Sequence, residues 1–401
     1  MSFLKILRYE LKKIFEQKSI WVIAIILLSV SMFNVYKSYY QKKTDENIGY
    51  ITTAEAENKM INHYSGELSP ERINEFMSDY AESEQASVND AVGEYNPDKY
   101  FYGFAYGDFQ IMQEIKNEME RIYFYNDYVT EIRNEALELS SAFSSSNAYL
   151  SKYNEKMADV YSQRKVTHFY NTKDFPIYFE YKFTSFIVMI LILLGLTTKF
   201  CGECETGMNQ TILTCKYGRD KTSIAKLFSG FIYVISVSVM FSVIDFVVFK
   251  LCLGFSGLNQ YLYAINEYAN TTLNLKIWQA LLLLFVVKTL GFLVFSGIIM
   301  LVSSVLNSSI KTYIVSALIT VFLMLFTIIV PDGIGEYLNL LNPVRLINSQ
   351  YLFKEFKAIN LFGTPVFTIF VAVISGVLLL CIISVVTLLV SRKYKAGRRV
   401  K

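Results

Sequence analysis

Histidine is scarce in this 401-residue sequence: His63 and His168 are the only two, and both lie in one hydrophilic stretch. No serine or cysteine is spaced from them in a pattern that indicates nucleophilic catalysis. A Gly-x-x-x-x-Gly-Lys-Ser/Thr motif is also absent, and the run from Gly218 to Thr222 is only faintly similar to one. We therefore expect no enzymatic activity in this chain and no binding of ATP phosphates through a P-loop.

The five cysteines are unevenly placed. The hydrophilic stretch 37–175 has none, so packing rather than disulfides must hold that segment together. Cys201, Cys204 and Cys215 offer three thiolates, but a structural zinc site takes four ligands and no histidine is close in sequence. We expect neither a metal nor a cofactor bound by the chain itself.

Long apolar runs are what the sequence has in excess, and hydrophobic residues make up 53% of it. About 20 apolar residues in a helix cross a hydrocarbon core of about 30 Å. The short second run is expected to extend through Tyr178, Phe179 and Tyr181. The pattern predicts an all-α membrane protein with six transmembrane helices, whose apolar runs are 19–36, 183–198, 227–249, 277–306, 312–330 and 364–391.

The basic residues predict the orientation of these helices. The segments 1–18, 199–226, 307–311 and 391–401 hold 17 Lys and Arg, whereas the loops 250–276 and 331–364 hold 5. Because cytoplasmic loops retain positive charge, both termini are predicted to be cytoplasmic in a multi-pass protein of the cell membrane. The first run is expected to be an uncleaved signal anchor, since no small-residue cleavage site follows it.

The chain is therefore divided into four parts. Residues 1–18 are predicted to form a cytoplasmic interfacial helix, with a plain cytoplasmic extension of the first membrane helix as the alternative. Residues 19–36 form the first transmembrane helix. Residues 37–175 form a large extracytoplasmic domain, and residues 176–401 form a membrane domain with five further transmembrane helices. A short helix is expected in the loop between residues 346 and 358.

The extracytoplasmic domain is predicted to be mainly helical. Ser69 before Pro70 indicates a helix start, and a long helix from Asp108 is followed by a polar break at 140–147 and a second amphipathic helix. The segment 37–174 carries 24 acidic and 14 basic residues, a charge distribution that argues against nucleic-acid binding. Two roles remain open for this domain: it receives or releases a substrate, or it serves as a solvated spacer or assembly surface.

A motif follows the second apolar run. It begins Phe200-Cys201-Gly202-Glu203-Cys204-Glu205-Thr206-Gly207 and continues to Ile212-Leu213, Gly218-Arg219 and Lys226. The sequence resembles the first cytoplasmic loop of ABC-2-type permeases, in which Phe-x-x-Glu-x-x-x-Gly precedes a Leu-rich turn, a Gly/Ser-Arg pair and a lysine. That loop is the family's coupling helix, around residues 200–219 here. The resemblance implies that the following residues contact an ATPase subunit: Glu203, Glu205, Gly207, Met208, Ile212, Leu213, Gly218 and Arg219.

The resemblance also implies partners and a function. The chain is expected to be the permease subunit of an ABC exporter and to couple ATP hydrolysis, with Mg²⁺, on a separate ATP-binding subunit to export. It is expected to form a homodimer, or a heterodimer with a second permease, among membrane lipids. Candidate substrates are an antimicrobial peptide, a drug or a lipid-like amphiphile. The alternative is a non-transporting membrane receptor or sensor that captures a ligand with its extracytoplasmic domain.

Two apolar runs each contain one charge, Asp245 and Lys288. An ionisable residue at bilayer depth is costly and is a functional candidate for that reason. Three interpretations remain open at this point: a structural ion pair, separate solvation by snorkelling, and handling of substrate or protons.

Overall fold

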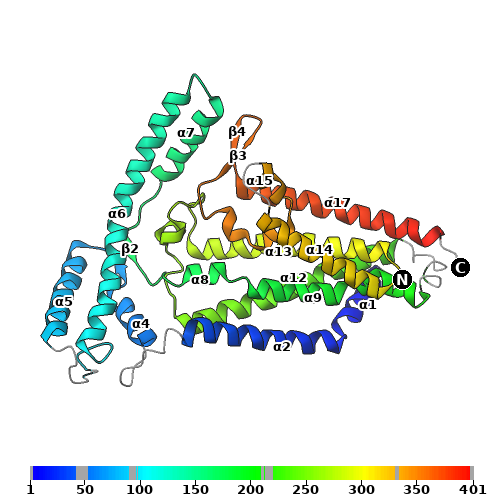
Figure 1. Cartoon of the computed structure of the whole chain (residues 1–401), viewed down its shortest axis with the longest axis horizontal. Helices are drawn as coiled ribbons and strands as arrows, with labels where there is room; N and C mark the ends of the chain where they lie inside the picture. The colour runs from blue at the N-terminus through cyan, green and yellow to red at the C-terminus, as the bar shows by residue number, and fades with distance from the viewer. Residues whose placement is uncertain are drawn as a thin grey trace.

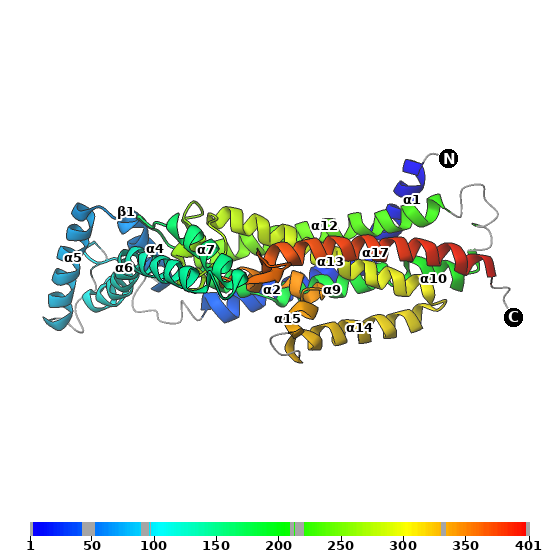
Figure 2. The same ribbon diagram turned by 90° about the horizontal axis from the view of Figure 1, so that it is seen from above.

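The computed structural model describes residues 3–41, 53–89, 96, 98–208, 212, 220–329 and 334–397. The helices form an elongated bundle with a helical region at one end, which we call the head and define as residues 53–174 (Figure 1). Helix α1 and the end of α17 lie at the end of the bundle opposite the head, and the perpendicular view in Figure 2 agrees.

Six helices among the described residues are long and apolar enough to cross a membrane, which confirms the predicted all-α membrane fold. The second is longer than its apolar run because α8, α9 and α10 follow one another from Phe175 to Glu205. The six are α2 (Lys18–Val35) continued by η1 (Tyr36–Gln41), then α8 (Phe175–Glu180) with α9 (Phe183–Leu196) and α10 (Thr198–Glu205), then α12 (Lys221–Leu253), α13 (Ile277–Val305), α14 (Ser309–Ile329) and α17 (Thr368–Gly397).

Helix α13 lies at the centre of the bundle and packs against α9, α12, α14 and α17. Its side chains Phe292, Phe295 and Ile299 are buried. Large apolar side chains on α14 and α17, among them Leu318 and Ile382, are exposed instead. Exposed apolar faces on helices whose backbone groups are bonded internally are typical of helices in contact with lipid or with another transmembrane helix.

The predicted amphipathic helix is present as α1 (Phe3–Phe15), which packs against α12. Its end is joined to the first span, since Trp21 Nε1 donates a hydrogen bond of 2.8 Å to the carbonyl of Phe15. The side chains of Glu10 and Ile14 are buried. Helix α1 is therefore fixed against the bundle by one side.

The head is built mainly from helices. The backbone N–H of Arg72 lies 3.3 Å from Ser69 Oγ, which confirms the predicted N-cap. Helices α6 and α7 form a hairpin, and Asn147 caps α7 by accepting bonds from the N–H groups of Tyr149 and Leu150. The elements are α4 (Thr53–Tyr64), β1 (Gly66–Glu67), α5 (Pro70–Asn89), α6 (Ala105–Phe143), α7 (Ala148–Ser162) and β2 (His168–Phe169), with β1 and β2 antiparallel.

The head is bonded to the loops between the spans. The guanidinium of the buried Arg164 donates to the carbonyl of Ala269 at 2.9 Å and to Asn274 Oδ1 at 2.9 Å. Tyr153 Oη donates to the carbonyl of Phe356 at 3.1 Å. Because these partners come from two different loops, the head contacts the bundle at several independent points. The first of these loops holds η2 (Leu262–Ala264) and η3 (Asn266–Tyr268).

The loop before the last span departs from the single short helix expected between 346 and 358. Helical turns begin earlier, at residue 334, and the last of them, at 349–352, lies within the expected range. A hairpin of β3 with β4 follows, so the last span begins at Thr368 rather than at residue 364. Phe362 and Gly363 both have positive φ, a conformation that turns the chain tightly between two strands. The elements are α15 (Ile334–Asn339), α16 (Pro343–Ile347), η4 (Ser349–Leu352), β3 (Ala358–Leu361) and β4 (Thr364–Phe367).

Candidate coupling site

Five charged side chains gather at the end of the bundle opposite the head, and we call them the ion cluster. Glu10 and Lys13 come from α1, Lys199 and Glu203 from α10, and Lys226 from the start of α12. Residues three or four apart share one face of a helix, so each pair on α1 and α10 faces the other helix. The cluster thus joins α1 to α10 and α12, which lie far from it in sequence.

The ion pairs of the cluster are largely removed from solvent. Lys199 Nζ lies 2.9 Å from Glu10 Oε2 and also donates to the Glu10 carbonyl at 3.0 Å. Lys226 pairs with Glu203, and Lys13 Nζ lies 3.4 Å from one carboxylate oxygen of Glu10 and of Glu203. Only the side chain of Lys13 is substantially exposed, at 36%. Three cations share two carboxylates here, so every carboxylate has more than one positive neighbour.

These contacts shift the pKa values of the two α1 groups. Burial by itself raises the pKa of Glu10, but Lys199, with Lys226 and Lys13, outweighs burial and lowers that pKa below its ordinary value. Burial likewise lowers the pKa of Lys13, whereas Glu10 and Glu203 raise it above its ordinary value. Both groups are therefore held in their charged forms at neutral pH.

Helix α10 is also bonded to the fourth transmembrane helix. Ser303 Oγ, on α13, accepts hydrogen bonds from the N–H groups of Phe200 at 3.0 Å and Cys201 at 3.3 Å. The same hydroxyl donates to the carbonyl of Thr197 at 2.6 Å. These three bonds fall where α9 passes into α10, so α13 fixes the direction in which α10 leaves the bundle.

Glu205 joins α10 to the fifth transmembrane helix. Its carboxylate accepts hydrogen bonds from the N–H of Ser309, at 3.3 Å, and from the Ser309 hydroxyl. Ser309 is the first residue of α14, where a negative charge is favoured by the unpaired N–H groups and the helix dipole. Helix α10 is thus connected to α1, α12, α13 and α14 at once.

The residues predicted to contact an ATPase subunit occupy different environments. Glu203 is buried, with 7% exposed, and faces the lysines of the ion cluster. Glu205, the last residue of α10, is exposed, as are Gly207 and Met208 beyond it, and Gly207 adopts a φ of +71°. Ile212 is half-buried. The predicted contacts Leu213, Gly218 and Arg219 lie outside the described residues.

Sequence reasoning did not single out Glu10, Lys13 or Lys199. Their signal was present, because each interrupts an apolar helical pattern close to a predicted membrane boundary. Lys226 was noted only as the last residue of the motif. Which charge pairs with which depends on how α1 folds back onto α10, and no local pattern contains that information.

The two charges predicted at membrane depth line one small cavity of about 50 Å³, together with Ser185 and Gln350. Thr184 Oγ1 donates to Asp245 Oδ1 at 2.9 Å. Among the described contacts of Asp245 this hydrogen bond, rather than an ion pair with Lys288, holds the carboxylate. A cavity of this size accommodates water between the two groups. Their role stays a prediction.

Within the ranges that the structure describes, no three His, Cys, Asp or Glu side chains gather as a metal site would require. Cys201 is buried and Cys204 half-buried, whereas Cys215 falls outside the described ranges. Cys201 Sγ donates to the carbonyl of Thr197 at 3.2 Å, a contact that serves the helix rather than a ligand.

Comparison with known proteins agrees with the membrane architecture and with the motif around α10. Residues 4–393 match the family described as ABC-2 family transporter protein. None of the curated proteins matches the chain. Because the family match covers nearly the whole sequence, from α1 to the end of α17, the chain belongs to the ABC-2 family of transporter proteins as a membrane permease subunit.

Proposed function

We propose that this chain is the membrane subunit of an ATP-driven exporter and that α10 passes the movement of a separate ABC ATP-binding subunit to the transmembrane helices. The observation that carries the proposal is the set of bonds that join α10 to α1, α12, α13 and α14. A rigid element with connections to four helices and an exposed end has the form that such transmission requires.

The exposed end of α10 offers the contact surface. Met208 is 48% exposed and supplies an apolar contact for the partner subunit. The exposed Glu205 lies close to it in sequence and would contact the same partner. Gly207 allows the chain to turn sharply between them. ATP and Mg²⁺ would be held by the partner, since this sequence has no P-loop.

The ion cluster determines which helices move together with α10. Separating one partner from a buried ion pair leaves an uncompensated charge, which costs about 3–5 kcal/mol. Helix α10 therefore moves together with α1 and α12 more readily than it moves away from them. A force applied at Met208 would displace this group of helices as one body, while lipid-facing α17 is less directly connected.

The proposal includes a dimeric permease with its termini in the cytoplasm. Helix α1 and the end of α17 lie at the same end of the bundle, in agreement with the excess of Lys and Arg there (Figure 1). The exposed apolar faces of α14 and α17 suit lipid or a second permease. The substrate would be an amphiphile, such as a peptide, drug or lipid-like molecule, and the head would receive or release it.

Substitution of Met208 by aspartate tests the coupling role. We expect Met208→Asp to lose co-purification with the ATP-binding subunit, or to lose substrate-stimulated ATP hydrolysis, while the amount of folded permease in the membrane stays the same. Met77→Asp is the matched control, because Met77 is a similarly exposed methionine, at 41%, in the head. Full complex formation and coupled ATP hydrolysis in Met208→Asp would contradict the proposal.

A further inference from the structure

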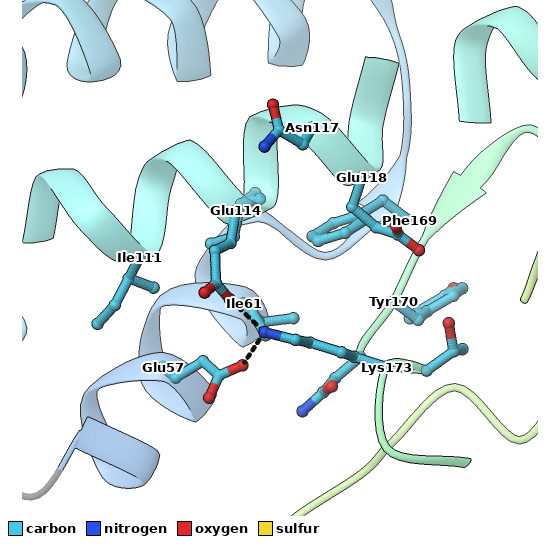
Figure 3. A pocket seen from close by; sticks show the side chains of 12 residues that line it. Glu57, Ile61, Ile111, Glu114, Asn117, Glu118, Phe169, Tyr170 and Lys173 are labelled. Atoms are coloured by element: carbon cyan, nitrogen blue, oxygen red, sulfur yellow. Dashed lines mark hydrogen bonds and ion pairs between the residues drawn. The ribbon is translucent and has the colours of Figure 1, made fainter. Parts of the chain in front are cut away.

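A pocket of about 300 Å³ lies in the head between α4, α6 and the segment 169–173, which leads from β2 into α8 (Figure 3). Its apolar wall comes from Ile61 on α4, from Ile111 and Ile115 on α6, and from Phe169. The volume is within the usual range for small-molecule sites, which are mostly apolar with a few polar groups that orient the ligand.

The polar side of the pocket has an excess of negative charge. Lys173 extends between Glu57, whose carboxylate it approaches to 3.4 Å, and Glu114 (Figure 3). A third carboxylate, Glu118, lies 2.6 Å from Arg121 Nη2. Among the side chains that the structure describes here, three carboxylates face two cations, and this balance favours a ligand with a positive charge.

A buried hydrogen-bond acceptor without a partner lines the same pocket. Asn171 is only 2% exposed, and its Nδ2 donates to Asn58 Oδ1 at 2.8 Å. Among the described residues, no donor reaches Asn171 Oδ1. A buried acceptor left unpaired is costly, so Asn171 gains a hydrogen bond if its side chain turns towards a donor in the pocket that it lines.

We propose that this pocket binds an organic ammonium ion, a protonated amine carried on a short hydrocarbon or aromatic group. The ammonium group replaces Lys173 at Glu114, whose side chain is 62% exposed, and donates a further hydrogen bond to Asn171 Oδ1 once the Asn171 side chain has turned into the pocket. Lys173 keeps its contact with Glu57. The hydrocarbon group packs against the isoleucines and Phe169, where burial of apolar area favours binding.

The position of the pocket links it to two transmembrane spans. Lys173 lies two residues before α8, whose continuation ends in the ion cluster. The carbonyl of Asn171 accepts a 3.0 Å hydrogen bond from the N–H of Ser256, just beyond the end of α12. A ligand that displaces Lys173 therefore acts at the head end of both spans. The idea that this site receives the transported substrate rests on the proposed exporter function. The idea that it binds an organic ammonium ion does not.

Titration calorimetry on the full chain in nanodiscs, without an ATP-binding subunit, tests the site. The probe is 2-phenylethylamine at neutral pH, with 2-phenylethanol and 3-phenylpropionate as neutral and anionic analogues of similar shape. We expect the amine to bind at least about tenfold more tightly than either analogue, since a charge-assisted hydrogen bond is lost in both. Equal binding of alcohol and amine would overturn the proposal.

Two substitutions on one helix separate the site from general charge effects. Glu114→Gln is expected to weaken amine binding about tenfold. Glu120→Gln, which removes the same charge from an exposed residue paired with Lys116 outside the pocket, is expected to leave binding unchanged. Equal affinities in the two variants would show that only the overall charge attracts the amine, and the site would be rejected.

Failure of this site is distinguishable from failure of the coupling role. Met208→Asp is expected to bind 2-phenylethylamine as the wild type does, because the pocket and the exposed end of α10 share no residue. If Met208→Asp keeps substrate-stimulated ATP hydrolysis and binds the amine, the coupling proposal fails and the proposed binding site stands. If it uncouples and the wild type does not distinguish amine from alcohol, only the site is lost.

Discussion

The helical run Phe175–Glu205 has charged groups at both of its ends, and the two ends differ in how those charges are paired. At the α10 end, the carboxylates of Glu10 and Glu203 are almost completely buried, and lysines contact them on several sides. At the α8 end, Lys173 is half-exposed and borders a pocket of about 300 Å³. We call the α10 end closed, because ion pairs shielded from solvent resist rearrangement, and the α8 end open, because a solvent-exposed lysine can be replaced by a ligand.

The two ends of this helical run are predicted to lie on opposite sides of the membrane. Cysteine labelling from outside the cell should therefore give an all-or-none difference between them. In a chain without its five native cysteines, Ser145→Cys in the turn between α6 and α7 should react with an impermeant maleimide in intact cells. Thr206→Cys, beyond α10, should react only after permeabilisation. Both positions are exposed, so access depends on the side of the membrane. The opposite labelling pattern would invert the topology.

Loss of Glu10 should produce the largest change in stability. Glu10→Ala leaves Lys199 buried without its carboxylate, and we expect the free energy of unfolding to fall by about 3–5 kcal/mol in denaturant titrations. Glu16→Ala is the control, because its pair with Lys12 is exposed and should change stability by less than about 1 kcal/mol. The double substitution Glu10→Lys with Lys199→Glu should recover part of the loss. Equal effects of Glu10→Ala and Glu16→Ala would contradict a stabilising cluster.

Loss of Lys173 should have a smaller effect than loss of Glu10. Glu114 is 62% exposed, and removal of the half-exposed Lys173 charge opens the buried Glu57 to water in the pocket, so Lys173→Met should lower the free energy of unfolding by only about 1 kcal/mol. The same denaturant titration measures it. A loss as large as that of Glu10→Ala would mean that the α8 end is as closed as the α10 end, and the distinction between them would disappear.

The smallest expected effect is a difference in pH dependence between two carboxyl groups. The pKa of Glu10 is lowered because its lysines outweigh burial, so its contribution to stability is present above its ordinary value of 4.5 and is lost as the pH falls further. Burial raises the pKa of Asp108 in the head, although the N–H groups of Tyr102 and Phe101 lower it. The contribution of Asp108 is therefore present below its ordinary value of 3.8 and is lost as the pH rises through the raised pKa.

Unfolding titrations on either side of pH 4.5 measure this difference. Glu10→Gln should flatten the loss of stability on acidification, because the group that loses its charge is absent. Asp108→Asn should steepen the same loss, since the compensating gain on protonation of Asp108 is removed. Slopes that change in the same direction in both variants would contradict these assignments.

The helices could be predicted from sequence more fully than the site. Apolar length alone located the six spans, and Ser69 and Asn147 lie at helix starts where short polar side chains are favoured. The β3–β4 hairpin was missed because residues 364–367 are continuous with an apolar run, and its turn depends on the positive φ of Phe362, which is unusual for a phenylalanine.

The motif located α10 but not the orientation of its side chains. Glu203 was expected to face a partner subunit, and in the structure it faces Lys226 and Lys13. Glu205, two residues later, is exposed and bonded to the start of α14. A spacing of two places side chains on nearly opposite faces of a helix, but deciding which face is covered requires the position of α1.

Gly291 restricts how α13 can move. A Cβ atom at this position would lie 2.7 Å from the backbone nitrogen of Ile347 and 2.9 Å from the Leu346 side chain, so α16 touches the bare backbone of α13. If α13 turned about its own axis, the side chain of Leu290 or Phe292 would be brought against α16, where there is no room for it. Rotation is therefore excluded unless α16 lifts away, and α13 and α16 are expected to move together when the central helix of this permease tilts.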